Sequence, residues 1–212
     1  MKKIPLCLLI PLAVFGQEPK DSGHDAGPTV EAEFVASDIF RSGTLLIKVY
    51  KNIHLDGEYF GAPEYDLGIT GVNYRLTWKS LSVSPGLAAG FGGSANTVPV
   101  FTVRWNLETH RWFSQGFFAQ SLAEYHTSRK GNRLARAAES EASYSSVLDN
   151  NHISARIGPV EAGGLWEHIA YRDDNEWKGG VRLAVRIKEK YKLIFQCVGP
   201  GVEYRGGVAF EK

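Results

Sequence analysis

Cysteine and long apolar runs are both scarce in this chain. The 212 residues include two cysteines, Cys7 and Cys197, and Cys7 lies in the apolar run Ile4–Phe15 near the N-terminus. After that run, no segment has the roughly 20 consecutive apolar residues that a membrane-spanning helix needs. If Cys7 is removed with a signal segment, Cys197 remains alone, which excludes an intrachain disulfide. Another source of stability is then required, and a closed ladder of paired strands supplies one.

Neither sign of charge dominates. The chain has 24 Lys and Arg against 23 Asp and Glu, a formal net charge of +1. Removal of an N-terminal signal segment takes away Lys2 and Lys3 and no acid, so the two signs stay almost equal. So balanced a charge gives no sign of the basic surface by which proteins hold nucleic acid, and we expect no nucleic-acid partner.

Phosphate- and metal-binding motifs are also missing. The glycine-rich run Gly90–Gly93 opens no helix and precedes no Lys-Ser or Lys-Thr pair, which excludes a phosphate-binding loop. The six histidines are dispersed and show no metal-ligand spacing with the single remaining cysteine. The sequence therefore predicts neither a metal nor an organic cofactor.

The N-terminus predicts export. Two lysines follow the initial methionine and precede the short apolar run Ile4–Phe15, which is the arrangement of a signal peptide. We place the signal peptide at residues 1–16, with cleavage after Gly16. A lipoprotein interpretation through Cys7 is rejected because a leucine precedes it where a small residue is required. Residues 17–28 are polar with proline and glycine, and they predict a flexible leader.

The last third of the chain alternates apolar and charged residues with a period of two. The odd positions are Trp177, Gly179, Val181, Leu183, Val185 and Ile187, and the even positions are Lys178, Gly180, Arg182, Ala184, Arg186 and Lys188. The alternation returns from Val202 to Phe210. A strand places successive side chains on opposite faces. One apolar and one charged face over about ten residues is typical of a strand in a membrane-spanning barrel.

Twelve segments are predicted as strands. They are Thr29–Ser37, Thr44–Tyr50, Ile53–Phe60, Tyr65–Trp78, Leu81–Gly92, Thr97–Leu107, Arg111–Glu124, Ile153–Gly158, Val160–Tyr171, Glu176–Ile187, Tyr191–Val198 and Val202–Phe210. Two of them alternate poorly, and Gly68, Gly71, Gly163 and Gly164 are expected to mark bulges there. The prediction is a single all-β domain over residues 29–212. It is an antiparallel up-and-down transmembrane barrel of about twelve strands, within a range of roughly eight to fourteen.

The connections between these segments support a membrane barrel. Those on one side are tight turns, whereas those on the other are longer and include residues 125–151, predicted as a long polar outer loop. Outer-membrane barrels have short periplasmic turns and longer outer loops. Aromatic girdles are expected at both rims: Trp78, Trp112, Phe113, Tyr191 and Phe210 at one, and Tyr59, Phe91, Tyr125, Tyr171 and Trp177 at the other.

In this pattern the chain resembles small bacterial outer-membrane barrels. Its ending at Phe210 is similar to the C-terminal strand of such barrels, although two charged residues follow the aromatic one. The resemblance implies an outer-membrane location, assembly by the barrel-assembly machinery, and contact with outer-membrane lipid and lipopolysaccharide. Periodicity alone does not distinguish inside from outside. A soluble periplasmic lipocalin-like barrel, with its apolar face inward around a ligand, is therefore an alternative.

The polar faces of the predicted strands define a set of charged residues expected to line the lumen. These are Glu31, Glu33, Lys48, His54, Asp56, Glu58, Arg104, Arg156, Arg182, Arg186, Glu203 and Arg205. Because the first and last strands must pair to close a barrel, we expect Glu31 and Glu33 to face Arg205. Two roles follow: a narrow pore in which rows of arginine select anions, or a salt-bridged interior that stiffens the barrel and passes nothing.

Two His-x-Ser pairs occur, at His126–Ser128 and His152–Ser154. On a strand the two residues share a face, as a base and a nucleophile require, and Glu139 is placed to orient His126. This resembles the lipid A deacylases of the PagL type, which are outer-membrane barrels. Arg129 stands where that family usually has an asparagine, and the pair lies far from the C-terminus. A lipid A-modifying hydrolase is thus a further alternative, and no residue is assigned as catalytic.

The predicted outer loop carries mixed charge. Arg129, Lys130, Arg133 and Arg136 lie close to Glu139 and Glu141. Such a segment either contacts the anionic head groups of lipopolysaccharide, as basic segments do at anionic membranes, or is a solvated loop. The oligomeric state is not encoded in any of these patterns.

Overall fold

The computed structural model describes residues 30–62, 65–91, 97–127, 142–144, 146–171 and 174–211. The predicted signal peptide and leader lie outside these residues. The strands are β1 Val30–Ala36, β2 Arg41–Tyr50, β3 Ile53–Ala62, β4 Tyr65–Tyr74, β5 Leu76–Trp78, β6 Leu81–Phe91, β7 Val98–Glu108, β8 Trp112–Ser121, β9 Tyr125–Thr127, β10 Ala142–Tyr144, β11 Ser146–Ile157, β12 Val160–Tyr171, β13 Asp174–Lys188, β14 Tyr191–Val198 and β15 Glu203–Glu211. In the described part of the chain, no helix is long and apolar enough to cross a membrane.

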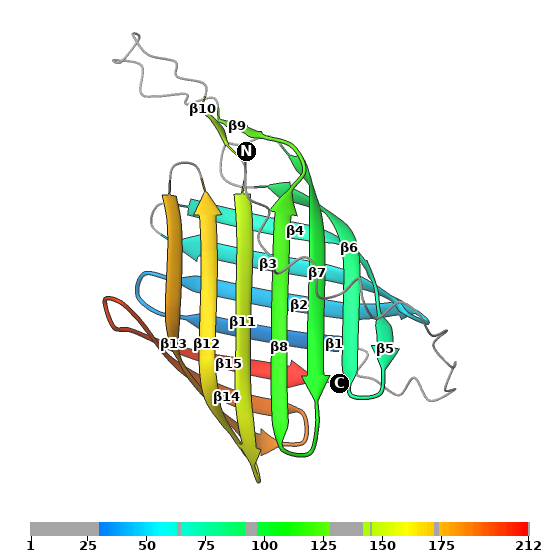
Figure 1. The fold of residues 1–212 in the computed structure, drawn as a ribbon, viewed down its shortest axis with the longest axis vertical. Helices are drawn as coiled ribbons and strands as arrows, with labels where there is room; N and C mark the ends of the chain where they lie inside the picture. Colours follow the sequence, from blue (N-terminus) through cyan, green and yellow to red (C-terminus); the bar gives the residue numbers. More distant parts are fainter. Residues whose placement is uncertain are drawn as a thin grey trace.

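The strands close into one antiparallel barrel. Each wall strand pairs with its neighbours along the chain, and β1 pairs with β15 to complete the ring. Strands β4 and β5 both pair with β6 and are separated only by Arg75, so they form one wall strand. Counted in this way, the described residues form a closed barrel of 12 strands, which confirms the predicted fold class. Strands β9 and β10 pair only with each other, beyond one end of the wall (Figure 1).

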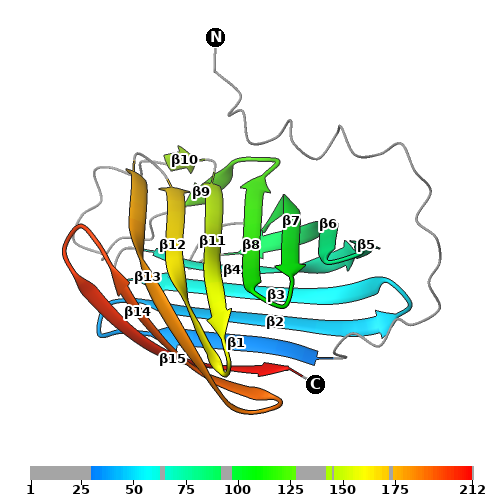
Figure 2. The same cartoon turned by 60° about the horizontal axis from the view of Figure 1, so that its bottom comes forward.

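The two ends of the barrel differ in their connections. At one end the wall strands are joined by tight turns such as Lys51-Asn52 and Lys79-Ser80, where both lysines adopt positive φ. The opposite end carries the longer connections and the β9–β10 ladder. In Figure 1 the front strands β8, β11 and β12 cross the rear strands β1, β2 and β3. Figure 2 shows the same crossing from another side, with β1 and β15 adjacent.

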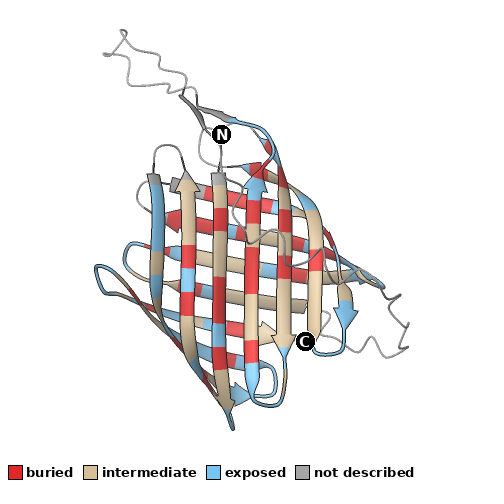
Figure 3. Ribbon diagram, viewed as in Figure 1, coloured by how far each residue is buried: buried red, intermediate tan, exposed pale blue. Residues whose placement is uncertain are grey.

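Charged side chains face inward and apolar side chains face outward. Along β7, Thr102 and Arg104 are buried while Val103 and Trp105 between and beyond them are not. Outward residues such as Leu87 and Val181 are 66% and 62% exposed. Buried positions recur along the strands in Figure 3. A soluble lipocalin-like barrel requires the reverse arrangement, because its exterior must meet water.

All but one of the strand boundaries agree with the prediction to within three residues. The expected strand Ile153–Gly158 begins earlier, at Ser146, so part of the expected loop 125–151 belongs to β11. The expected bulges at the glycines are also wrong, because the register is continuous through Gly68, Gly71, Gly163 and Gly164. Register shifts occur instead at Lys48/Tyr50 and Arg186/Lys188, next to tight turns.

Exposed aromatic residues lie near both ends of the wall. Trp78, Trp112 and Tyr191 are exposed near the tight turns, and Tyr59, Phe91 and Trp177 near the longer connections. Phe113 was expected at a rim but is 5% exposed and points into the barrel, because it alternates with the outward Trp112. The side chains of Tyr125 and Tyr171 lie outside the described structure.

Candidate functional site

The barrel interior holds several groups of paired charges, the first centred on Arg104. This side chain from β7 reaches two carboxylates of β3: Nη2 lies 2.6 Å from Oδ1 of Asp56 and also contacts Oε1 of Glu58. Asn73 donates to Oδ2 of Asp56 at 2.7 Å, and Thr44 donates to Oε2 of Glu58 at 2.9 Å. All three charged residues are buried. Hydrogen bonds to the remaining carboxylate oxygens offset part of the cost of burying these charges.

Arg205 on β15 organises a second group. Its Nη1 donates to Glu167 at 2.6 Å, while Nε and Nη2 donate to the two oxygens of Glu203 at 2.9 and 3.1 Å. Glu203 also accepts from Ser37 at 2.6 Å, and the guanidinium lies 3.8 Å from the centre of the Phe40 ring. Ser37 and Phe40 belong to the connection between β1 and β2. Arg205 and Glu203 therefore link that connection to the barrel interior.

A third group surrounds Glu161 on β12. Oε1 of Glu161 lies 2.8 Å from Arg156, 3.4 Å from Lys192 and 4.0 Å from Arg186. Lys192 also pairs with Glu211 at 2.9 Å. This group lies at the end of the barrel that has the tight turns, because Arg156 and Glu161 flank the Gly158-Pro159 turn. Arg156 also pairs with Glu108 at 2.9 Å, so three cations share three acids here.

Glu31 and Glu33 have different partners from the predicted one. Glu33 accepts from Nη2 of Arg182 at 3.0 Å, and Glu31 accepts from Arg75 at 3.0 Å. The expected pairing with Arg205 is wrong because of the register at the seam. Strand β1 pairs with β15 only as far as Ala36 opposite Gly206, so Arg205 lies beyond the end of β1.

The other predicted lumen residues lie on the same inner face. Lys48 is half-buried on β2, and His54, opposite it on β3, is 3% exposed with Nδ1 3.2 Å from the carbonyl of Asn52. The sequence analysis missed four interior charges: Arg75, Glu161, Glu167 and Lys192. Glu161 and Glu167 share a face of β12, but Gly163 and Leu165 between them hide the polar repeat.

An apolar cluster fills the interior towards the longer connections. Its buried members are Phe40, Phe60, Leu67, Ile69, Val98, Val100, Phe117, Ala119 and Leu148. The rings of Phe60 and Phe117 stack with their centres 6.5 Å apart. The guanidinium of Arg104 contacts this cluster and lies 4.7 Å from the centre of the Phe117 ring. Charged and apolar groups are therefore in direct contact inside the barrel, Arg104 at Phe117 and Arg205 at Phe40.

One small cavity lies in the interior. Beside Arg104 lies a cavity of about 40 Å³, lined by polar residues from both walls that include Glu58, Gln115, Asn150, His152 and Gln196, with Phe60 and Phe117 at one side. A space of this size holds a few water molecules.

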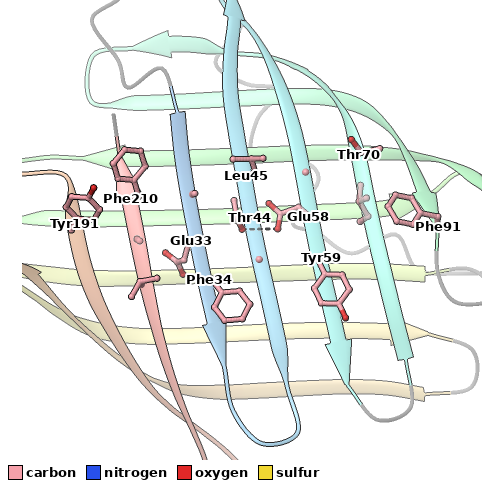
Figure 4. A pocket seen from close by; sticks show the side chains of 16 residues that line it. Glu33, Phe34, Thr44, Leu45, Glu58, Tyr59, Thr70, Phe91, Tyr191 and Phe210 are labelled. Atoms are coloured by element: carbon pink, nitrogen blue, oxygen red, sulfur yellow. Dashed lines mark hydrogen bonds between the residues drawn. The ribbon is translucent and has the colours of Figure 1, made fainter.

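Another hollow lies on the outside of the barrel. It is a shallow groove of about 620 Å³ across β15, β1, β2, β3 and β4. In Figure 4, Phe34, Leu45, Tyr59 and Phe91 lie around it. These side chains are between 40% and 49% exposed and belong to the apolar outer surface.

The two His-x-Ser pairs are placed differently. His126 lies on β9, in the short ladder outside the barrel wall, while its side chain, Ser128 and Glu139 are outside the described structure. His152 and Ser154 are both buried on the inner face of β11, away from membrane lipid. Among the described residues, no three His, Cys, Asp or Glu side chains are grouped so as to hold a metal ion.

The comparisons with known proteins bear on the fold. No protein-family model and no curated protein sequence matches the chain. Among solved structures it is similar to the KdgM porin, at 14% identity over 85% of this chain and 97% of that one, with a TM-score of 0.55. The NanC porin is similar at 12% identity over 86% and 98%, with a TM-score of 0.54. A second KdgM structure, with the same coverage, 14% identity and a TM-score of 0.54, is a complex with disordered oligogalacturonate.

These similarities cover nearly the whole length of the two porins, and at such low identity they concern the fold alone. The closed barrel and its apolar exterior agree with them and indicate the outer membrane. The molecule has the fold of a small bacterial outer-membrane porin.

Proposed function

We propose that this barrel is a narrow pore that passes ions and small polar solutes through its charged lumen. The observation that carries the proposal is a row of buried polar groups across β11, β13 and β14. Ser154, Arg182 and Gln196 lie in this row, with Gly163 of β12 between the first two. We call these three residues the open polar row.

Several atoms of the open polar row have no hydrogen-bond partner within the described structure. They are Oγ of Ser154, Nε and Nη1 of Arg182, and Oε1 of Gln196. A sealed, purely structural interior would be expected to satisfy such buried groups from within the protein. Unpartnered donors and acceptors on a lumen wall are instead suited to hydrogen-bond water and passing solutes.

The dimensions favour small permeants. The cavity beside Arg104 has room for a few waters, and the apolar cluster adjoins it. Hydrophobic constrictions of this kind regulate permeation by dewetting. The oligogalacturonate in the KdgM complex supports a polar solute as a general class, because a barrel of this fold accommodates one in that protein.

Measuring conductance in planar bilayers tests the proposal, first for the wild type and then for Arg182→Gln. Removing this guanidinium leaves the carboxylate of Glu33 without its ion-pair partner, so the lumen becomes more negative. The cation-to-anion permeability ratio, obtained from the reversal potential in a salt gradient, should rise several-fold. It should rise further when Arg186→Gln is added. Glu189→Gln, in the exposed turn between β13 and β14, should change nothing. A folded barrel that conducts no more than protein-free bilayers would show that the interior is a structural plug.

A further inference from the structure

One part of the outer wall departs from its apolar character. The outward positions of β1, β6 and β15 are apolar residues or glycine. On β11, β12 and β13, the outward positions near the longer connections include Asp149, Asn151, His168 and Asn175, which we call the outer-wall polar patch. Their strands lie side by side in Figure 1, and the patch is near the end of the wall that has β9 and β10.

The alternation along each strand places these side chains outside. Asp149 and Asn151 share a face of β11 with Ile153, which is 45% exposed, while Leu148 and His152 on the other face are buried. His168 likewise shares a face of β12 with Trp166, and Asn175 a face of β13 with Trp177. Both tryptophans are exposed.

The members of the patch are held in place by one another. Asp149 lies opposite His168, which in turn lies opposite Trp177. Nδ2 of Asn151 donates to Oδ1 of Asp149, and Nε2 of His168 lies 2.8 Å from Oδ1 of Asn175. The His168 ring stacks on Trp177 with ring centres 3.9 Å apart and planes 8° apart. The side chains are therefore arranged before any ligand binds, which lowers the entropic cost of binding.

Polar side chains that face a membrane are costly unless they lie at head-group level and find partners there. Trp166 and Trp177 lie beside the patch, and tryptophan is a residue type enriched at head-group level. Asn151 is only 2% exposed, and its Oδ1 has no hydrogen-bond partner within the described structure. The patch thus combines a carboxylate, amides and an imidazole with an acceptor that is unused.

We propose that the outer-wall polar patch binds a glycolipid, the lipopolysaccharide of the outer leaflet. The contacts are made to the hydroxyl and amide groups of the sugar head group. The carboxylate of Asp149 accepts from hydroxyl and amide donors and repels phosphate, which distinguishes this contact from a basic lipid site. The longer connections at this end of the barrel correspond to the outer side in barrels of this kind. The inference does not depend on whether the lumen conducts.

Titration of purified lipopolysaccharide into phosphatidylethanolamine–phosphatidylglycerol nanodiscs containing the barrel tests this, with intrinsic tryptophan fluorescence as the readout. Asp149→Ala should weaken binding about tenfold, which corresponds to the loss of one hydrogen bond to a charged group. His168→Phe keeps a ring to stack on Trp177 and should also weaken binding. Thr70→Ala removes an outward hydroxyl on the remote strand β4 and is the matched control.

Each variant must first show a heat-modifiable band, which establishes that its barrel is closed. Equal affinity for the wild type, Asp149→Ala and His168→Phe would overturn the proposal, as would an equal loss in Thr70→Ala. The same fluorescence change on adding phosphatidylethanolamine in place of lipopolysaccharide would also contradict it. Crosslinked dimers that form in the wild type and disappear in Asp149→Ala would identify the patch as a protein interface instead.

Discussion

At the scale of single residues, Arg104 is the counter-charge of two buried carboxylates. It is 6% exposed and is the cation that contacts both Asp56 and Glu58 on β3. Arg104→Gln leaves two adjacent carboxylates buried without a counter-charge. Breaking a buried ion pair from one side lowers the free energy of unfolding by about 3–5 kcal/mol. Urea unfolding in lipid vesicles, followed by tryptophan fluorescence, measures this change.

A second background separates two causes of the lower free energy of unfolding in Arg104→Gln: the lost ion pairs and the lost packing of the side chain. In an Asp56→Asn/Glu58→Gln background, the same Arg104→Gln change should cost much less, because no uncompensated carboxylate remains. If Arg104→Gln were equally costly in both backgrounds, its stabilising effect would come from its contact with the Phe117 ring and not from the ion pairs.

At the scale of the strand, the seam between β1 and β15 contains two neighbouring glycines with opposite surroundings. A Cβ added to Gly207 would lie 2.3 Å from the carbonyl oxygen of Phe34, whereas one added to Gly206 would meet no atom within 4 Å. Gly207→Ala therefore requires the two closing strands to move apart. We expect it to reduce the fraction of heat-modifiable, closed barrel after refolding, while Gly206→Ala refolds as the wild type does. Equal yields from the two variants would show that the seam accommodates the methyl group.

Most strands could be predicted because one physical rule governs them. Where the inward residues are polar and the outward residues are apolar, a period of two appears, as in the second half of β7, where Thr102, Arg104 and Asn106 alternate with Val103, Trp105 and Leu107. The sequence also placed Arg104, Arg182 and Arg205 on the polar faces where the structure has them. It could not pair them, because partners such as Arg205 and Glu167 lie on strands that are not neighbours, and their meeting depends on the closed barrel.

The missed start of β11 has its cause at one end of the barrel. The start of β11 was interpreted as loop because Asp149 and Asn151, which face outward, are polar, while the inward Leu148 is apolar. Here the apolar cluster inside and the outer-wall polar patch outside reverse the usual pattern. The weak alternation of β12, where Ile169 is inward and His168 outward, has the same origin. The reversal is informative, because it marks where β11 and β12 pack against the apolar cluster inside the barrel and carry the outer-wall polar patch outside.

At the scale of the whole molecule, the proposed pore function gives the apolar cluster a role in passage through the lumen. Phe60 stacks on Phe117 and also lines the small cavity beside Arg104. Phe60→Ala removes a large ring from the constriction and admits water to that level. Under the proposed pore function, single-channel conductance should rise several-fold, because an apolar constriction that wets more readily presents a lower barrier to ions.

The adjacent residue provides the control. Tyr59 precedes Phe60 on β3 but is 40% exposed on the lipid side, so Tyr59→Ala removes a similar ring without changing the lumen. Its conductance should equal that of the wild type. Equal conductance of Phe60→Ala and wild type, in barrels that both show the heat-modifiable band, would place the constriction elsewhere, with the ion pairs around Arg104 as the next barrier along the axis. Because Phe60 and Tyr59 are adjacent aromatic residues on opposite faces of β3, the comparison tests directly whether passage is governed from inside the barrel.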